Sequence, residues 1–140
     1  MRTLSLVVML AAACFAQAPT FQDMVKDAKT RIKEMSAEQL KAATESKEKL
    51  VLIDVREESE WAAGHAAAAV LIPRGVLEAR IASKAPDKAA KIVLYCAGGF
   101  RSALATDTLQ KMGYTDVYSL AGGFGAYSKA GLPVETPAGK

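Results

Sequence analysis

The 140-residue chain holds one histidine and two cysteines, too few thiol and imidazole ligands for a structural metal site. It has no basic run and no cluster of basic and aromatic residues, and its formal net charge is only +3. These shortages argue against nucleic acid as a partner. The apolar run at residues 4–13 is too short to span a bilayer as a permanent helix. We expect no metal, no cofactor, no nucleic-acid partner and no membrane span.

The first 18 residues differ in composition from the rest of the chain. A short basic start at 1–3 precedes the apolar run at 4–13 and several small residues, which together predict a secretory signal peptide over 1–18. The cleavage position within this segment stays open. The segment 10–14 also resembles a bacterial lipobox, which would place a lipid anchor on Cys14. We expect export, either to the bacterial periplasm or out of the cell.

Removal or capping of that segment leaves Cys96 as the only free thiol, so an internal disulfide is excluded. An apolar run ends at Cys96, the small residues Gly98 and Gly99 follow, and Arg101 precedes a predicted helix. Small residues let the loop turn its backbone N–H groups inward, and the N-terminus of the helix adds positive potential. The pattern predicts a thiolate nucleophile of lowered pKa inside an anion-binding loop.

Apolar periodicity predicts helices alternating with strands along the chain. We expect helices at 21–32, from 37, at 57–63, 76–81, 102–112 and 124–129, and strands at 50–55, 69–72, 91–95 and 116–120. The run at 50–55 is continuously apolar, which favours a parallel sheet covered on both faces. The expected fold is a small three-layer α/β domain with a mostly parallel five-stranded sheet flanked by helices. An extra amphipathic helix at 19–34, a domain at 35–135 and a tail at 136–140 complete the predicted organisation.

Further motifs stand in order along the chain: Leu52-Ile53-Asp54-Val55-Arg56-Glu57, Glu60-Trp61, Gly64-His65, Ile72-Pro73, Gly113-Tyr114, Leu120-Ala121-Gly122-Gly123-Phe124 and Gly131-Leu132-Pro133-Val134. Together with Tyr95-Cys96-Ala97-Gly98-Gly99-Phe100-Arg101-Ser102 they resemble the rhodanese family over 35–135. The resemblance implies a single-domain sulfurtransferase. It also implies a thiosulfate or persulfide donor, a thiol or cyanide acceptor, and a monomer or homodimer.

The resemblance implies a role for each residue of the cysteine loop. Cys96 is the expected catalytic nucleophile, which carries sulfur as a persulfide. The substrate is expected to contact the residues that follow it: Ala97, Gly98, Gly99, Phe100, Arg101 and Ser102. Six residues run from Cys96 to Arg101, one fewer than in the cysteine loop of protein tyrosine phosphatases, which has room for a phosphoryl group. No general acid is evident near the loop, so the pattern favours sulfur over phosphate chemistry.

Two arginines and the single histidine receive supporting roles. Arg101 either holds the anionic donor or pairs with a carboxylate and braces the loop, and the sequence leaves both roles open. Arg56 stands beside Asp54 and is expected to brace the domain rather than bind substrate. The resemblance places His65 in a structural turn, so we expect a structural histidine rather than a catalytic base.

The chain departs from the family at 66–69, where four alanines stand in place of the usual isoleucine, proline, glycine and alanine. Ala68 cannot adopt a positive φ as cheaply as glycine, so the conformation of this turn is in question. Two other functions stay open beside the enzyme. One is a non-enzymatic persulfide carrier that uses Cys96, and the other is an interaction module built on the same fold.

Overall fold

The computed structural model of the protein describes residues 17–137. Its main sheet has five parallel strands in the order β1-β6-β5-β2-β4. These strands are β1 (Lys33–Met35), β2 (Val51–Asp54), β4 (Val70–Leu71), β5 (Ile92–Tyr95) and β6 (Val117–Leu120). The predicted α/β fold with a parallel five-stranded sheet is confirmed, and the strand that leads to the cysteine loop lies at its centre.

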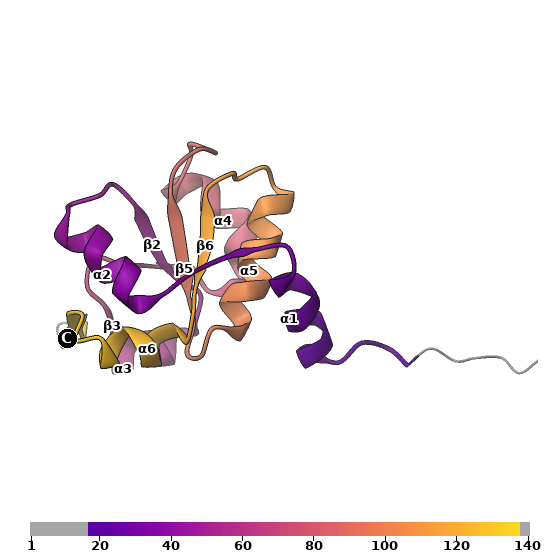
Figure 1. The fold of residues 1–140 in the computed structure, drawn as a ribbon, viewed down its shortest axis with the longest axis horizontal. Helices are drawn as coiled ribbons and strands as arrows, with labels where there is room; N and C mark the ends of the chain where they lie inside the picture. The colour runs from indigo at the N-terminus through magenta and orange to yellow at the C-terminus, as the bar shows by residue number, and fades with distance from the viewer. Residues whose placement is uncertain (1–16, 138–140) are drawn as a thin grey trace, which may run out of the picture.

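Helices cover both faces of this sheet (Figure 1). They are α1 (Phe21–Lys29), α2 (Ala37–Glu45), α3 (Glu58–Ala63), α4 (Leu77–Lys84), α5 (Phe100–Lys111) and α6 (Gly123–Lys129), with a 3₁₀ turn η1 (Arg74–Val76) before α4. Ile53 and Leu94 pack on the face that carries α4 and α5, whereas Leu52 and Val93 pack on the face that carries α2 and α6. Burial on both faces explains why the central strands are continuously apolar.

Because the strands are parallel, their carboxyl ends meet at one edge of the sheet. Asp54 of β2 pairs in register with Tyr95 of β5, directly before Cys96. Leu94 pairs with Ser119 of β6, one residue before that strand ends. The motifs that follow β2, β5 and β6 are therefore assembled at this edge.

Several elements differ from the sequence-based expectation. Strand β1 was not predicted, because Lys33 and Glu34 are exposed on an edge strand and give no apolar run. A small antiparallel pair, β3 (His65–Ala66) with β7 (Val134–Glu135), is too short to leave an alternating pattern. Helix α5 begins at Phe100 rather than Ser102, because its N-cap is Gly99 in a left-handed conformation and no capping side chain marks the start.

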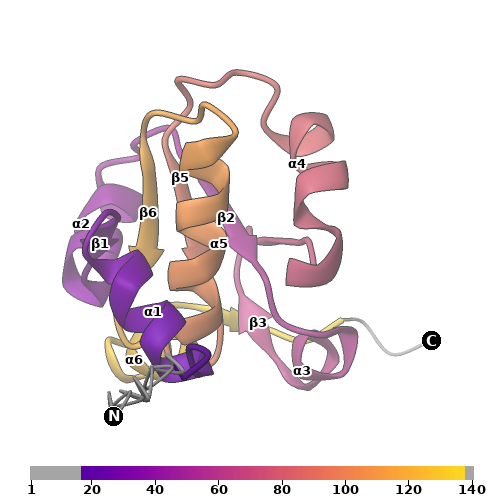
Figure 2. The same ribbon diagram turned by 90° about the vertical axis from the view of Figure 1, so that its right-hand side faces the viewer.

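Helix α1 forms where the amphipathic pattern predicts a helix, but it ends at Lys29 and does not continue to 32 or 34, because residues 33–35 join the main sheet as β1. A capping box between Thr20 and Asp23 starts it, and its buried residues Val25 and Ala28 pack against α5 (Figure 2). The predicted signal peptide lies almost wholly outside the described residues, as does Cys14. Within 17–137, no helix is both long enough and apolar enough to cross a bilayer.

Candidate active site

Cys96 follows β5 directly and is only 1% exposed. The chain then turns through Ala97, Gly98 and Gly99 into helix α5. Gly99 has φ +96°, and a Cβ there would lie 3.2 Å from the backbone nitrogen of Gly122. The tight turn therefore requires glycine at this position. It aims the N-terminus of a twelve-residue helix at the thiol.

The thiol sulfur lies among hydrogen-bond donors. The backbone N–H of Gly99 donates to Sγ of Cys96 at 3.1 Å, and Oγ of Ser102 lies 3.6 Å from the sulfur. Burial raises the pKa of the Cys96 thiol, but hydrogen bonds from the backbone and hydroxyl of Ser102 and from the N–H groups of Gly99 and Gly98 outweigh it, so the pKa is lowered. The thiolate that the sequence predicts is thus favoured by local hydrogen bonding.

Ser119 supports Ser102 from the neighbouring strand. Its Oγ lies 2.8 Å from Oγ of Ser102, and both side chains are fully buried. A hydroxyl can turn to donate to an ionised sulfur while it accepts from the other hydroxyl. The two serines therefore form a short polar relay behind Cys96.

Helix α6 holds the other side of the loop. The backbone N–H of Phe124 donates to the carbonyl of Cys96 at 2.7 Å, and that of Gly125 donates to the carbonyl of Ala97 at 3.3 Å. A Cβ on Gly123 would lie 2.5 Å from the Cys96 carbonyl oxygen, so only glycine permits this approach. With its carbonyls bound to α6, the loop is held in one shape.

Arg101 forms a bidentate ion pair with Glu60 of α3, with both N–O distances at 2.8 Å. The two side chains are each about one-third exposed, at 31% and 32%. Hydrogen bonds from Arg101 hold the pKa of Glu60 at about 2, and the bond to Glu60 raises the pKa of Arg101. The structure thus contains the carboxylate pair that the bracing role requires, and contact of Arg101 with the substrate stays a prediction.

Arg56 and Asp54 form a second ion pair, which is buried. Nη2 of Arg56 lies 2.7 Å from Oδ2 of Asp54, and the side chains are 5% and 0% exposed. Nη2 also donates to the carbonyl of Gly64 at 2.8 Å, and the guanidinium lies 4.3 Å from the ring centroid of Phe124. The pair thus connects β2 with the turn after α3 and with α6, which is the bracing position expected from the sequence.

His65 is buried and stacks on Trp61, with ring centroids 3.4 Å apart. Its Nδ1 lies 3.1 Å from the carbonyl oxygen of Trp61. These are the contacts of a structural histidine. In the turn that follows, Ala68 adopts φ +61°, so the chain keeps the left-handed conformation with alanine where glycine is cheaper.

The structure brings the predicted loop residues together around the sulfur, but they are not equivalent. Ala97, Gly98 and Phe100 are exposed at the mouth, whereas Gly99 and Ser102 are buried beside or behind the thiol. Sequence reasoning assigned no role to Glu60, Ser119 or Gly123. The pair Gly122-Gly123 follows β6 at the edge where ligands bind, and such a glycine pair can indicate a close approach of two backbones. For Glu60 and Ser119, the neighbouring sequence gives no indication of a role in the site.

The described part of the chain contains no group of three or more histidine, cysteine, aspartate or glutamate side chains placed to hold a metal ion. Chemically, the site offers a buried, readily ionised sulfur within a ring of backbone N–H groups. Such an arrangement suits covalent attack on an anionic substrate.

Comparison with known proteins shows which family and which relatives the chain resembles. The rhodanese-like domain family matches residues 36–130. A sulfurtransferase of Allochromatium vinosum is 32% identical over 108 residues, covering 77% of this chain and 99% of its own. Thiosulfate sulfurtransferase 16 of Arabidopsis thaliana chloroplasts is 34% identical over 93 residues, covering 59% of this chain and 78% of its own. A solved Rhodopseudomonas palustris protein of unknown function, described as a possible tyrosine phosphatase, matches with TM-score 0.77 and 32% identity, over 86% of this chain and 97% of its own.

Proposed function

Because the chain belongs to the rhodanese-like domain family, we propose that it is a sulfurtransferase that carries sulfane sulfur on Cys96. The observation that carries this proposal is the hydrogen bonding at Sγ: Gly99 donates at 3.1 Å and Ser102 lowers the pKa of the thiol. The names of the Allochromatium and Arabidopsis relatives support the same chemistry. We further propose, from the predicted signal peptide, that the protein works outside the cytoplasm.

The proposed reaction has two steps. The Cys96 thiolate attacks the outer sulfur of thiosulfate, so a new S–S bond forms while the sulfur–sulfur bond of the donor breaks and sulfite leaves with the electron pair. An acceptor, a thiolate or cyanide, then attacks the outer sulfur of the persulfide, and the electron pair of the broken S–S bond returns to Sγ of Cys96. No general base is needed, because the loop already favours the thiolate.

Loop size argues against phosphoryl transfer, although one solved neighbour is described as a possible phosphatase. The six-residue loop from Cys96 to Arg101 is shorter than the phosphatase loop, and Arg101 is engaged with Glu60. Hydrolysis of p-nitrophenyl phosphate by the wild-type protein, lost in Cys96→Ser, would favour the phosphatase instead.

Mass spectrometry after thiosulfate treatment tests the proposal. We expect a gain of one sulfur on the peptide that contains Cys96, and steady turnover in a thiosulfate and cyanide assay. Cys96→Ser is expected to fold and to lose both signals. Sulfur loading without turnover on small acceptors would identify a carrier, and the absence of loading from both thiosulfate and a small persulfide would leave an interaction module.

A further inference from the structure

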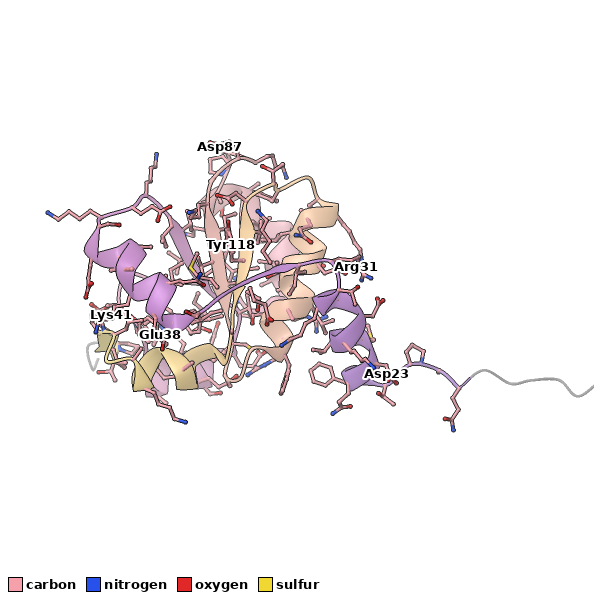
Figure 3. The ribbon with its side chains drawn as sticks, in the orientation of Figure 1. Asp23, Arg31, Glu38, Lys41, Asp87 and Tyr118 are labelled. Atoms are coloured by element: carbon pink, nitrogen blue, oxygen red, sulfur yellow. The ribbon has the colours of Figure 1, made fainter. Side chains whose placement is uncertain are left out.

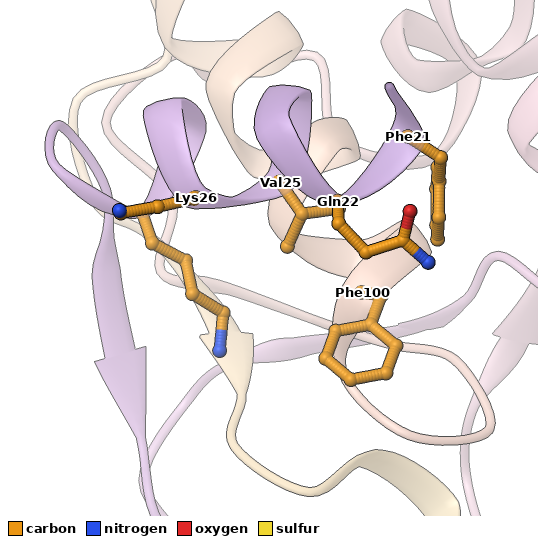
Figure 4. A pocket seen from close by; sticks show the side chains of 6 residues that line it. Phe21, Gln22, Val25, Lys26 and Phe100 are labelled. Atoms are coloured by element: carbon orange, nitrogen blue, oxygen red, sulfur yellow. The ribbon is translucent and has the colours of Figure 1, made fainter. Parts of the chain in front are cut away.

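A groove beside the cysteine loop has no part in the sulfur-transfer reaction described so far. It lies between α1 and the start of α5, has a volume of about 300 Å³, and is lined by Phe21, Gln22, Val25, Lys26, Lys29 and Phe100 (Figure 4). We call it the Phe100 groove. We propose, building on the sulfurtransferase function above, that it binds the sulfur acceptor, and that this acceptor is an organic thiol with an apolar body and an anionic group.

The wall formed by α1 is firmly attached to the domain. Val25 packs with Ala103 and Leu104 of α5 in one buried cluster. Arg31, just after the helix, donates from Nε and Nη2 to the two carboxylate oxygens of Asp107, each at 3.0 Å. The groove is therefore formed before any ligand arrives, which lowers the entropic cost of binding.

The groove offers apolar surface that an inorganic donor cannot use. Phe21 is 44% exposed and Phe100 is 54% exposed, and both rings lie below α1 in Figure 4. Thiosulfate has no apolar surface to place against them. A cavity of this volume lies at the small end of ligand pockets, so it suits a small organic molecule rather than a protein segment.

Positive charge at the groove selects for an anion. Among residues 17–137, no carboxylate lies within ion-pair distance of Lys26. Lys29 forms an ion pair with Glu34, with Nζ 3.0 Å from Oε1. The Lys29 ammonium also lies 5.9 Å from the ring centroid of Phe100. Lys26 is therefore the cation that remains to pair with a carboxylate of the acceptor.

Phe100 is the lining residue that the groove shares with the cysteine loop. It follows Gly99, whose N–H contacts Sγ of Cys96. The Cys96 side chain is buried, but the sulfur to be transferred lies one S–S bond of about 2 Å beyond it. An acceptor thiolate in the groove attacks this outer sulfur, the S–S bond to Cys96 breaks with its electron pair returning to Sγ, and the acceptor leaves as a persulfide.

The test isolates the second half of the reaction. Protein loaded with thiosulfate, and verified by mass, is mixed with 6-mercaptohexanoate, 6-mercaptohexanol or cyanide, and the discharge rate is measured. We expect the loaded protein to discharge its sulfur faster to 6-mercaptohexanoate (hexanoate below) than to 6-mercaptohexanol (hexanol below). Phe21→Ala should lower the ratio of hexanoate to cyanide rates about fivefold, through lost apolar contact. Lys26→Gln should lower the ratio of hexanoate to hexanol rates about threefold, as for an exposed ion pair.

Two variants serve as matched controls. Met24→Ala removes an apolar side chain that is 48% exposed on the same helix but does not line the groove. Lys41→Gln removes a lysine on α2, on the opposite side of the molecule (Figure 3). Neither should change the rate ratios. Equal rates for hexanoate and hexanol, or ratios unchanged in Phe21→Ala, would overturn the inference on a protein that still loads sulfur. Failure to load would overturn the sulfurtransferase function and this inference with it.

Discussion

Two turns of the molecule use left-handed backbone in different ways. In the cysteine loop and its α6 support, Gly99 and Gly123 have positive φ, and a Cβ on either would press against backbone atoms. In the alanine turn, residues 66–69, Ala68 has φ +61° with its side chain exposed. Close approach of two backbones admits glycine alone, whereas an open turn tolerates alanine at a cost of about 1 kcal/mol.

The two turns are joined by one buried ion pair. Arg56 binds Asp54, donates to the carbonyl of Gly64 ahead of the alanine turn, and lies over Phe124 of α6. Conformational precision at the cysteine loop thus depends on side chains that lie outside it. Five experiments test this contrast.

The largest effect is expected from Asp54→Asn. The change leaves the Arg56 charge buried without a carboxylate, so the free energy of unfolding should fall by about 3–5 kcal/mol. Urea denaturation measures it. Glu48→Gln, which removes the partner of the more exposed Lys91, should cost less than about 1 kcal/mol. Equal losses in free energy of unfolding for the two variants would show that burial of the Asp54–Arg56 pair does not increase its contribution to stability.

Gly123→Ala should disable the cysteine loop. The added Cβ would lie 2.5 Å from the carbonyl oxygen of Cys96, so the loop must shift, and a shift near 1 Å lowers the rate about 100-fold. The thiosulfate and cyanide assay measures the loss. Gly131→Ala is the matched control, because Gly131 also has a positive φ but its Cβ would meet no atom within 4 Å. Similar activity in both variants would mean that the contact with α6 does not set the loop.

The pH dependence of sulfur loading should report on Ser102. The pKa of Cys96 is lowered in part by the Ser102 hydroxyl, so the midpoint of loading should lie below the ordinary thiol pKa. Ser102→Ala should move the midpoint to higher pH, because it removes a donor that favours the thiolate. Ser83→Ala, on α4, should leave the midpoint in place. A midpoint unmoved by Ser102→Ala would assign the lowered pKa to the backbone alone.

Glu60→Gln should weaken stability by about 0.5–1 kcal/mol, the value for a partly exposed pair. The pKa of Glu60 is lowered to about 2 in the folded protein, so its contribution is complete above the usual glutamate pKa and is lost as pH falls through about 2. Unfolding curves of wild type and variant should therefore differ at pH 7 and converge near pH 2. A gap that persists at the acidic end would point to a packing role instead.

The smallest effect is expected at the alanine turn. Ala68→Gly relieves the left-handed strain but adds freedom to the unfolded chain, for a net gain of about 0.5 kcal/mol. Ala67→Gly, next to it and without a positive φ, should lose a similar amount. The two changes in thermal midpoint should have opposite signs. A loss in both variants would remove the contrast between the two turns.

Local patterns predicted more of the fold than of the site. The apolar runs at 50–55 and 91–95 marked the central strands correctly because both of their faces are buried. Edge strand β1 and the two-residue strands β3 and β7 carry no such pattern.

In the site, too, residues within one continuous segment could be predicted from the sequence, whereas partners distant in the sequence could not. The cysteine loop is a continuous segment, so its residue types indicated a thiolate in an anion cradle. Glu60 lies 41 positions from Arg101, and Ser119 lies 17 positions from Ser102. Only the folded arrangement brings those partners together, which is why the carboxylate that pairs with Arg101 could not be named from the sequence.

The central place of β5 has a consequence for how the protein opens. All four of its residues are fully buried, and it has hydrogen-bonded strands on both sides. Amide protons of 92–95 should exchange with deuterium only through global unfolding, whereas the amide of Gly98, whose partner is the thiol of the loop, should exchange through local opening. The boundary between these regimes falls at Cys96. The reactive sulfur is thus fixed to the slowest-opening part of the molecule on one side and borders exposed loop residues on the other.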